Sequence, residues 1–101
     1  MRVMVFYASG GYRCEEIENS LGALQNIVGG YIEPCAPVQL RRMGIELLAN
    51  EEGLLKGLPP NQNLYPFFYV GNVVAVGTAG ENFDELSDAQ VDFLHKWVVE
   101  L

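Results

Sequence analysis

The segment Met1–Tyr7 is apolar at every position except Arg2, and this pattern constrains the fold more than any other in the chain. If the segment is extended, successive side chains point to opposite faces, so both of its faces are apolar. Such a strand must be covered on both sides, either inside a sheet or at an oligomer interface. Ser9-Gly10-Gly11 is expected to end it.

A helix is predicted after this turn. Apolar residues recur at spacings of 4, 3 and 4, which is typical of a helix with one apolar face: Ile17, Leu21, Leu24 and Val28. Carboxylates at Glu15, Glu16 and Glu18 would lie near its N-terminus and complement the helix dipole. Gly29-Gly30 is expected to end it.

Several strands are predicted next. Pro34 and Pro37 would place the first of them at a sheet edge, and Val38–Arg42 is a candidate continuation of it. The segment Tyr65–Val70 contains Pro66 and is expected to be irregular or to lie at a sheet edge. Its aromatic residues, Tyr65, Phe67, Phe68 and Tyr69, either pack in the core or an interface or form a wall of an apolar pocket or a dimer contact. The strand candidates are Tyr31–Glu33, Ile45–Ala49 and Val73–Val76.

The last segment predicts an amphipathic helix. Ser87 and Gln90 have the spacing of a capping box. One apolar seam follows, made of Val91, Leu94, Val98 and Leu101. An early helix, several strands and a terminal helix predict a two-layer α+β fold, with a mixed or antiparallel sheet and the C-terminal helix packed on it. We expect a single domain over residues 1–101.

The charge balance limits the classes of partner. Thirteen acidic residues against six basic ones give a net charge of −7, which disfavours DNA or RNA as a partner. No apolar run reaches membrane-spanning length and no secretory signal is recognisable, so we expect a cytoplasmic protein that does not bind membranes. Cys14 and Cys35 are then expected to be reduced thiols.

Two segments could bind a ligand. Asn50–Asn61 combines turn residues with charged and amide side chains, and it is either a solvated loop or a polar rim that contacts a ligand. Gly29–Glu33 is either a helix end followed by a strand or a place where a ligand approaches the backbone closely. The candidate ligand-binding residues in these segments are Gly30, Tyr31, Glu33, Asn50, Glu51, Lys56 and Asn61.

Arg41 and Arg42 are further candidates, because guanidinium groups hold anions with paired hydrogen bonds. The alternative is that both are ordinary surface charges. No catalytic set is recognisable: His95 has no partner nearby in sequence, and Ser9–Gly11 lacks the spacing of a phosphate-binding loop. We therefore expect no catalytic residues, no metal site and no cofactor.

Two linked motifs carry a resemblance to a known family. The chain contains Val28-Gly29-Gly30-Tyr31-Ile32-Glu33 and Asn50-Glu51-Glu52-Gly53-Leu54-Leu55-Lys56-Gly57-Leu58-Pro59-Pro60-Asn61. In these motifs it resembles a family of small domains of unknown function from bacteriophages and bacterial mobile elements. The resemblance extends over nearly the whole chain and implies a phage accessory protein made in the bacterial cytoplasm.

These observations lead to one main functional expectation and two alternatives. The main expectation is an anti-defence protein that sequesters a nucleotide-like immune messenger without catalysis. As a homo-oligomer it would enclose the ligand, because a domain this small has little room for a pocket of about 300–1,000 Å³. Tyr31 would stack on the ligand, Asn50 and Asn61 would form hydrogen bonds, and Arg41, Arg42 or Lys56 would neutralise phosphate. The alternatives are a protein–protein inhibitor directed at a host factor and a hydrolytic enzyme.

Overall fold

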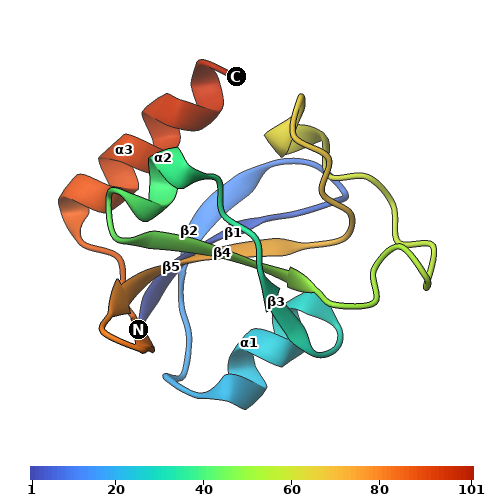
Figure 1. Ribbon diagram of the computed structural model, residues 1–101, viewed down its shortest axis with the longest axis horizontal. Helices are drawn as coiled ribbons and strands as arrows, with labels where there is room; N and C mark the ends of the chain where they lie inside the picture. The colour runs from blue at the N-terminus through green and yellow to red at the C-terminus, as the bar shows by residue number, and fades with distance from the viewer.

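The computed structural model describes all residues, 1–101, and consists of one six-stranded antiparallel sheet and three α-helices (Figure 1). The strand order is β2-β1-β5-β4-β3, and β6 pairs with β5. The predicted α+β class is thus confirmed, with the sheet antiparallel throughout. The elements are β1 (Arg2–Phe6), β2 (Tyr12–Glu16), α1 (Leu21–Val28), β3 (Ile32–Pro34), α2 (Val38–Arg41), β4 (Ile45–Asn50), a 3-10 helix η1 (Gln62–Leu64), β5 (Val73–Ala79), β6 (Asn82–Asp84) and α3 (Asp88–Val99).

Both faces of the sheet are covered, as the apolar pattern of β1 requires. Figure 1 shows the sheet nearly edge-on, with α1 on one side and α2 and α3 on the other. Met4 and Phe6 belong to the core beneath α2 and α3, whereas Val3 and Val5 belong to the core beneath α1. All four side chains are at most 3% exposed. The two helical coverings therefore lie on opposite faces of the sheet, so the domain has helices in two layers where the predicted two-layer fold had them in one.

The capping box of α3 is present. The Ser87 hydroxyl accepts a hydrogen bond from the Gln90 backbone N–H at 3.1 Å, and the Gln90 side chain accepts one from the Ser87 N–H at 2.9 Å. Leu94 is fully buried in the core beneath this helix, whereas Leu101 of the predicted seam lies beyond the helix end and is partly exposed. The C-terminal helix packs on the sheet as expected.

The prediction for the segment after the first turn was wrong. Residues Tyr12–Glu16 form β2, which pairs along its whole length with β1, and the helix begins only after Ser20. Gly10 and Gly11 both have positive φ angles, which lets the chain reverse tightly. Pairing with a buried neighbouring strand then outweighs the local preference of the glutamates for a helix start.

Two further elements differ from the prediction. Val38–Arg41 forms the short helix α2 and does not continue the edge strand. Pairing with β4 ends near Cys35, whose N–H still donates to the Leu47 carbonyl, and the chain then turns at Pro37 to bury Leu40. β6 is too short to produce a recognisable alternation in the sequence.

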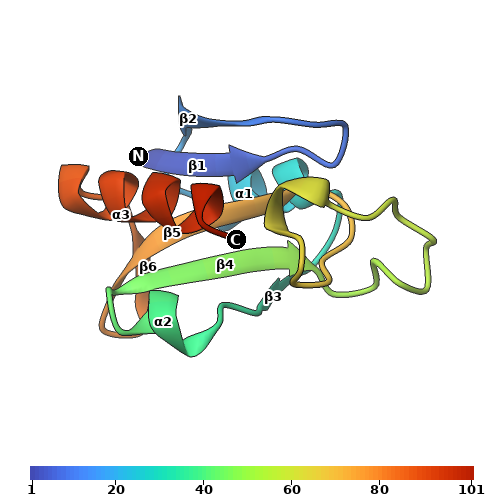
Figure 2. The ribbon, with the colours of Figure 1, turned by 90° about the horizontal axis from the view of Figure 1, so that it is seen from above.

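The long connection between β4 and β5 lies at one end of the sheet and projects away from the rest of the molecule (Figure 2). Asn61 anchors it, because its side-chain amide donates to the carbonyls of Phe6 and Gly71, both at 2.9 Å. The connection also contacts itself where Gly53 meets Val70: a Cβ on Gly53 would lie 2.8 Å from the Val70 side chain. These contacts bring the turn after β4 beside the segment that precedes β5.

Candidate functional site

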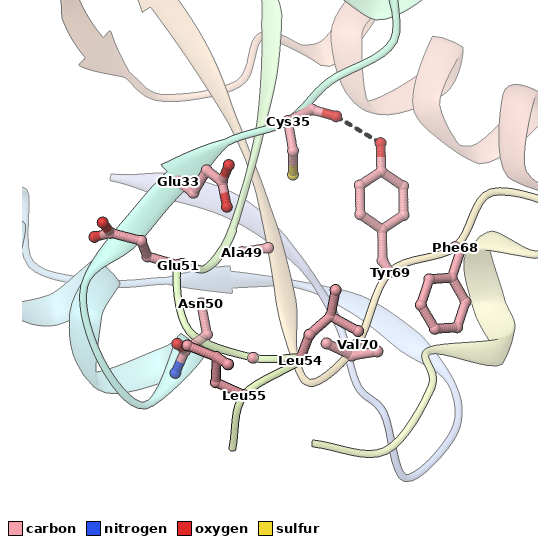
Figure 3. Close-up of a pocket in the computed structure, with 11 residues that line it drawn as sticks. Glu33, Cys35, Ala49, Asn50, Glu51, Leu54, Leu55, Phe68, Tyr69 and Val70 are labelled. Carbon is pink, nitrogen blue, oxygen red and sulfur yellow. Dashed lines mark hydrogen bonds between the residues drawn. The ribbon is translucent and has the colours of Figure 1, made fainter. Parts of the chain in front are cut away.

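A groove of about 440 Å³ lies where this connection meets β3 and β4. Figure 3 shows Glu33 and Glu51 on one side and Phe68 and Tyr69 on the other. The lining residues are Glu33, Cys35, Ala49, Asn50, Glu51, Gly53, Leu54, Leu55, Phe68, Tyr69 and Val70. The groove is thus formed by an edge strand, its neighbour and two parts of one loop.

The charged groups of the groove are both acidic. Glu33 and Glu51 are exposed, and neither carboxylate forms an ion pair within the chain. No lysine or arginine lines the groove. In a protein of net charge −7, this arrangement makes the groove attractive to cations and unfavourable to phosphate.

The apolar side of the groove is open to solvent. Leu54, Leu55 and Phe68 are 71%, 87% and 70% exposed. Three large apolar side chains around one concave surface differ from singly scattered ones, which are normal on any protein surface. Contiguous exposed apolar surface of this kind is typical of interaction sites.

The floor of the groove is held in place by internal hydrogen bonds. The Asn50 amide donates to the Val28 carbonyl at 3.1 Å, and its oxygen accepts from the Glu52 N–H at 2.8 Å. Asn50 therefore joins the loop to the end of α1. On the opposite wall, the Tyr69 hydroxyl donates to the Cys35 carbonyl at 2.6 Å. These bonds preform the groove, so a ligand would not need to order it.

Cys35 lies in the groove as a protonated thiol. Burial, and next the nearby charges of Glu46 and Glu33, raise the pKa of Cys35 to about 12. Its thiol also lies 3.4 Å from the Leu47 carbonyl, within hydrogen-bonding distance. A thiolate is the nucleophilic form of cysteine, so this residue is poorly suited to nucleophilic chemistry.

We therefore expect the two cysteines to react very differently. At pH 8, the thiolate of Cys35 should be about 1,000-fold less populated than that of a thiol with the ordinary pKa of 9.0. A colorimetric disulfide reagent should titrate one thiol quickly in the native protein, at exposed Cys14, and two thiols after denaturation. Peptide mapping of the labelled native protein would identify the fast site. Equal labelling rates would contradict this assignment.

Six of the predicted ligand-binding residues lie in or beside the groove. Glu33, Asn50 and Glu51 line it. Gly30 lies close by, since a Cβ added there would be 2.9 Å from the Asn50 amide nitrogen and 3.3 Å from the Lys56 ammonium. Tyr31 is exposed, and its carbonyl accepts a hydrogen bond from the Glu51 N–H at 2.9 Å. The two segments singled out in the sequence therefore meet in space.

The other three predicted residues lie elsewhere. Arg41, on α2, donates to the largely buried Glu46 carboxylate at 3.1 Å. Arg42 follows it at the end of α2, and neither arginine lines the groove. Asn61 is 2% exposed, and its amide donates to two backbone carbonyls, which anchors the connection; its ligand contact stays a prediction.

Sequence reasoning missed Leu54 and Leu55 as site residues. Their signal was present: apart from Leu58, the other residues of Asn50–Asn61 are polar or turn residues, so the two adjacent leucines have no amphipathic element to bury them. Phe68 and Tyr69 do line the groove, as the aromatic segment predicted. His95 has a partner far along the chain, the Tyr12 hydroxyl at 2.6 Å, and this pair is not part of the groove.

The longest helix, α3, has 12 residues, and no helix combines the length and apolar character needed to cross a bilayer.

Comparison with curated proteins and with solved structures finds no match. A family described as a domain of unknown function, DUF3846, matches residues 1–98. That match covers nearly every residue of the sheet and helices described above, and the chain belongs to the DUF3846 family.

Proposed function

We propose that this domain is a non-catalytic binding module whose groove takes a segment of a partner protein with an apolar side chain beside a lysine or arginine. One observation carries the proposal: the residues that line the groove include three exposed apolar side chains and two unpaired carboxylates, but no lysine or arginine. A segment of the opposite character would satisfy both parts of this surface.

The dimensions suit a few side chains. A volume of about 440 Å³ lies within the range of known ligand pockets, about 300–1,000 Å³. Burying one leucine-sized side chain against Leu54 and Phe68 contributes about 1.5–3 kcal/mol. A cation near Glu33 or Glu51 adds specificity and faster association more than affinity, because both carboxylates are exposed.

A nucleotide-like ligand is the second candidate. Exposed Tyr31 offers an aromatic face, and Lys56 approaches Gly30 on the same side of the loop. A base could stack on the tyrosine while the ammonium contacts phosphate. Glu51, whose N–H bonds to the carbonyl of Tyr31, would repel the phosphate, so this candidate ranks below a basic protein segment.

The nature of the partner is part of the proposal. The resemblance to phage and mobile-element domains supports a bacterial host protein, met in the cytoplasm, as the partner. Binding without turnover would block that protein by occupying a surface it needs, which is an anti-defence role. Sequestration of an immune messenger is the corresponding role for the second candidate.

Two matched peptides test the first candidate. One is a fluorescein-labelled, capped peptide with two leucines flanked by lysines, and the other has glutamates in place of the lysines. We expect fluorescence anisotropy to show binding of the basic peptide only. Reversing both groove charges, with Glu33→Lys and Glu51→Lys, should weaken that binding by about tenfold or more.

The control variant combines Glu81→Lys and Glu100→Lys, which changes net charge equally at exposed positions outside the groove. It should keep most of the affinity. Equal binding of both peptides, or equal losses in both variants, would contradict the proposal. A rise in melting temperature with cyclic dinucleotides or ADP-ribose derivatives, but not with the basic peptide, would favour the second candidate instead.

A further inference from the structure

The two edges of the sheet differ in how well they are protected against pairing with another strand. β3 has three residues and includes Pro34, which has no N–H to donate. β2 has five residues, contains no proline, and pairs with β1 along one side only. Figure 2 shows β2 as the outermost strand, with no element beyond it. β6 also pairs on one side only, but it has three residues, so β2 offers the longest open edge to another strand.

The backbone groups at this edge follow from the ladder with β1. The Ile17 N–H donates to the Met1 carbonyl, and the Tyr7 N–H donates to the Gly11 carbonyl. Because bonded and non-bonded pairs alternate in an antiparallel ladder, the odd-numbered residues Arg13 and Glu15 bond to β1. The even-numbered residues of β2 are Tyr12, Cys14 and Glu16, and their N–H and C=O groups point away from β1.

We propose that two copies of this chain pair antiparallel through their β2 edges, about a twofold axis at Cys14. The axis places Cys14 opposite the same residue of the second copy and Arg13 opposite its Glu15. Arg13 and Glu15 then occupy non-hydrogen-bonded positions, where opposite Cα atoms are about 4.5 Å apart and side chains are closest. Each dimer contains this oppositely charged pair twice.

Charge also selects this register among its neighbours. An axis at Arg13 would place two arginines opposite each other, and an axis at Glu15 would do the same with two glutamates. Like charges directly opposite destabilise a sheet. Within one copy, the Arg13 Nε already lies 3.3 Å from a Glu15 carboxylate oxygen, so pairing about Cys14 creates a square of four alternating charges.

The dimer leaves the groove accessible. β2 lies at the opposite edge of the sheet from β3, which forms part of the groove. Two grooves in one particle would bind a bivalent partner more strongly than one groove, without any new contact. The inference does not depend on what the groove binds.

Light scattering after size exclusion tests this interface with charge reversals. Wild-type protein should have twice the 11.2 kDa mass of one chain. Arg13→Glu and Glu15→Arg should each weaken dimerisation by about tenfold or more, because both pairs become repulsive. The double variant should restore the dimer, since it exchanges the two charges. Arg42→Glu, an exposed substitution on another element, should leave it unchanged.

Circular dichroism should show that each variant is folded. As a second measurement, a short thiol-to-thiol crosslinker should join two wild-type chains through Cys14, and Cys14→Ser should abolish the product. A wild-type monomer at high protein concentration would overturn the proposal. So would a double variant that stays monomeric while folded, or crosslinking that survives loss of Cys14.

Discussion

Replacing Asn61 with alanine is expected to lower the free energy of unfolding by about 2–5 kcal/mol. The asparagine amide donates to the carbonyls of Phe6 and Gly71, and its oxygen accepts a hydrogen bond from the Asn63 side chain at 3.0 Å. The residue is 2% exposed, so water cannot readily replace these partners. Each buried polar group left unsatisfied costs about 1–3 kcal/mol. Urea denaturation followed by circular dichroism measures the loss.

Gln62→Ala is the matched control, because Gln62 is the exposed neighbour of Asn61. It should change stability by less than about 0.5 kcal/mol. The comparison also separates an anchoring role from the ligand contact predicted for Asn61. A fully stable Asn61→Ala variant would contradict the anchoring role, and with it the account of how the loop is held against β1.

Leu94→Ala should have an effect of similar size, about 2–5 kcal/mol, for a different reason. Leu94 is fully buried beneath α3, in the core cluster that contains Phe6 and Leu40. The substitution removes apolar contacts and leaves a cavity that the packed sheet can fill only in part. Domains of this size have total stabilities of about 5–15 kcal/mol, so the variant should melt well below the wild type.

Val99→Ala provides the control on the same helix. Val99 is mostly exposed at the end of α3, so removing its methyl groups creates no cavity. Differential scanning calorimetry should show a large drop in melting temperature for Leu94→Ala and little change for Val99→Ala. Equal drops would contradict the account in which α3 is stabilised by packing Leu94 on the sheet, because alanine is a better helix former than either residue it replaces.

Much of the fold could be predicted because some segments have only one plausible environment. β1 and β5 are apolar on both faces, and both are covered on both faces in the structure. The capping box at Ser87 marked the start of α3 correctly. In these segments local pattern and tertiary burial agree, so the sequence alone was sufficient.

The prediction failed where tertiary pairing decided the structure. Tyr12–Glu16 has little apolar character of its own, and it becomes a strand because β1 offers a partner across a tight glycine turn. Val38–Arg41 looks like a strand continuation but is a helix, because the chain turns at Pro37, directly before it, and the helix buries Leu40. Neither the pairing of β2 with β1 nor the burial of Leu40 can be identified from a local window of sequence.

The site was predicted in part for the same kind of reason. Glycines and polar residues in two loops identified Gly30, Glu33, Asn50 and Glu51, which the fold brings together. The positions of the arginine side chains could not be predicted, because the sequence pattern did not indicate α2. This helix places Arg41 beside Glu46, with which it forms an ion pair. Because no arginine lines the groove, we propose a cationic partner ahead of a phosphate.

Amide chemical shifts of ¹⁵N-labelled protein, titrated with the unlabelled basic leucine peptide, test the central claim most directly. A peptide binding near 1 mM or tighter gains at least about 4 kcal/mol and gives measurable shifts. Binding in the groove should move the amides of residues 49–55 and 68–70, together with Glu33, and leave those of β2, at the opposite edge of the sheet, unchanged. Shifts centred on another face, or equal shifts with the acidic peptide, would contradict a groove built for a basic, apolar partner.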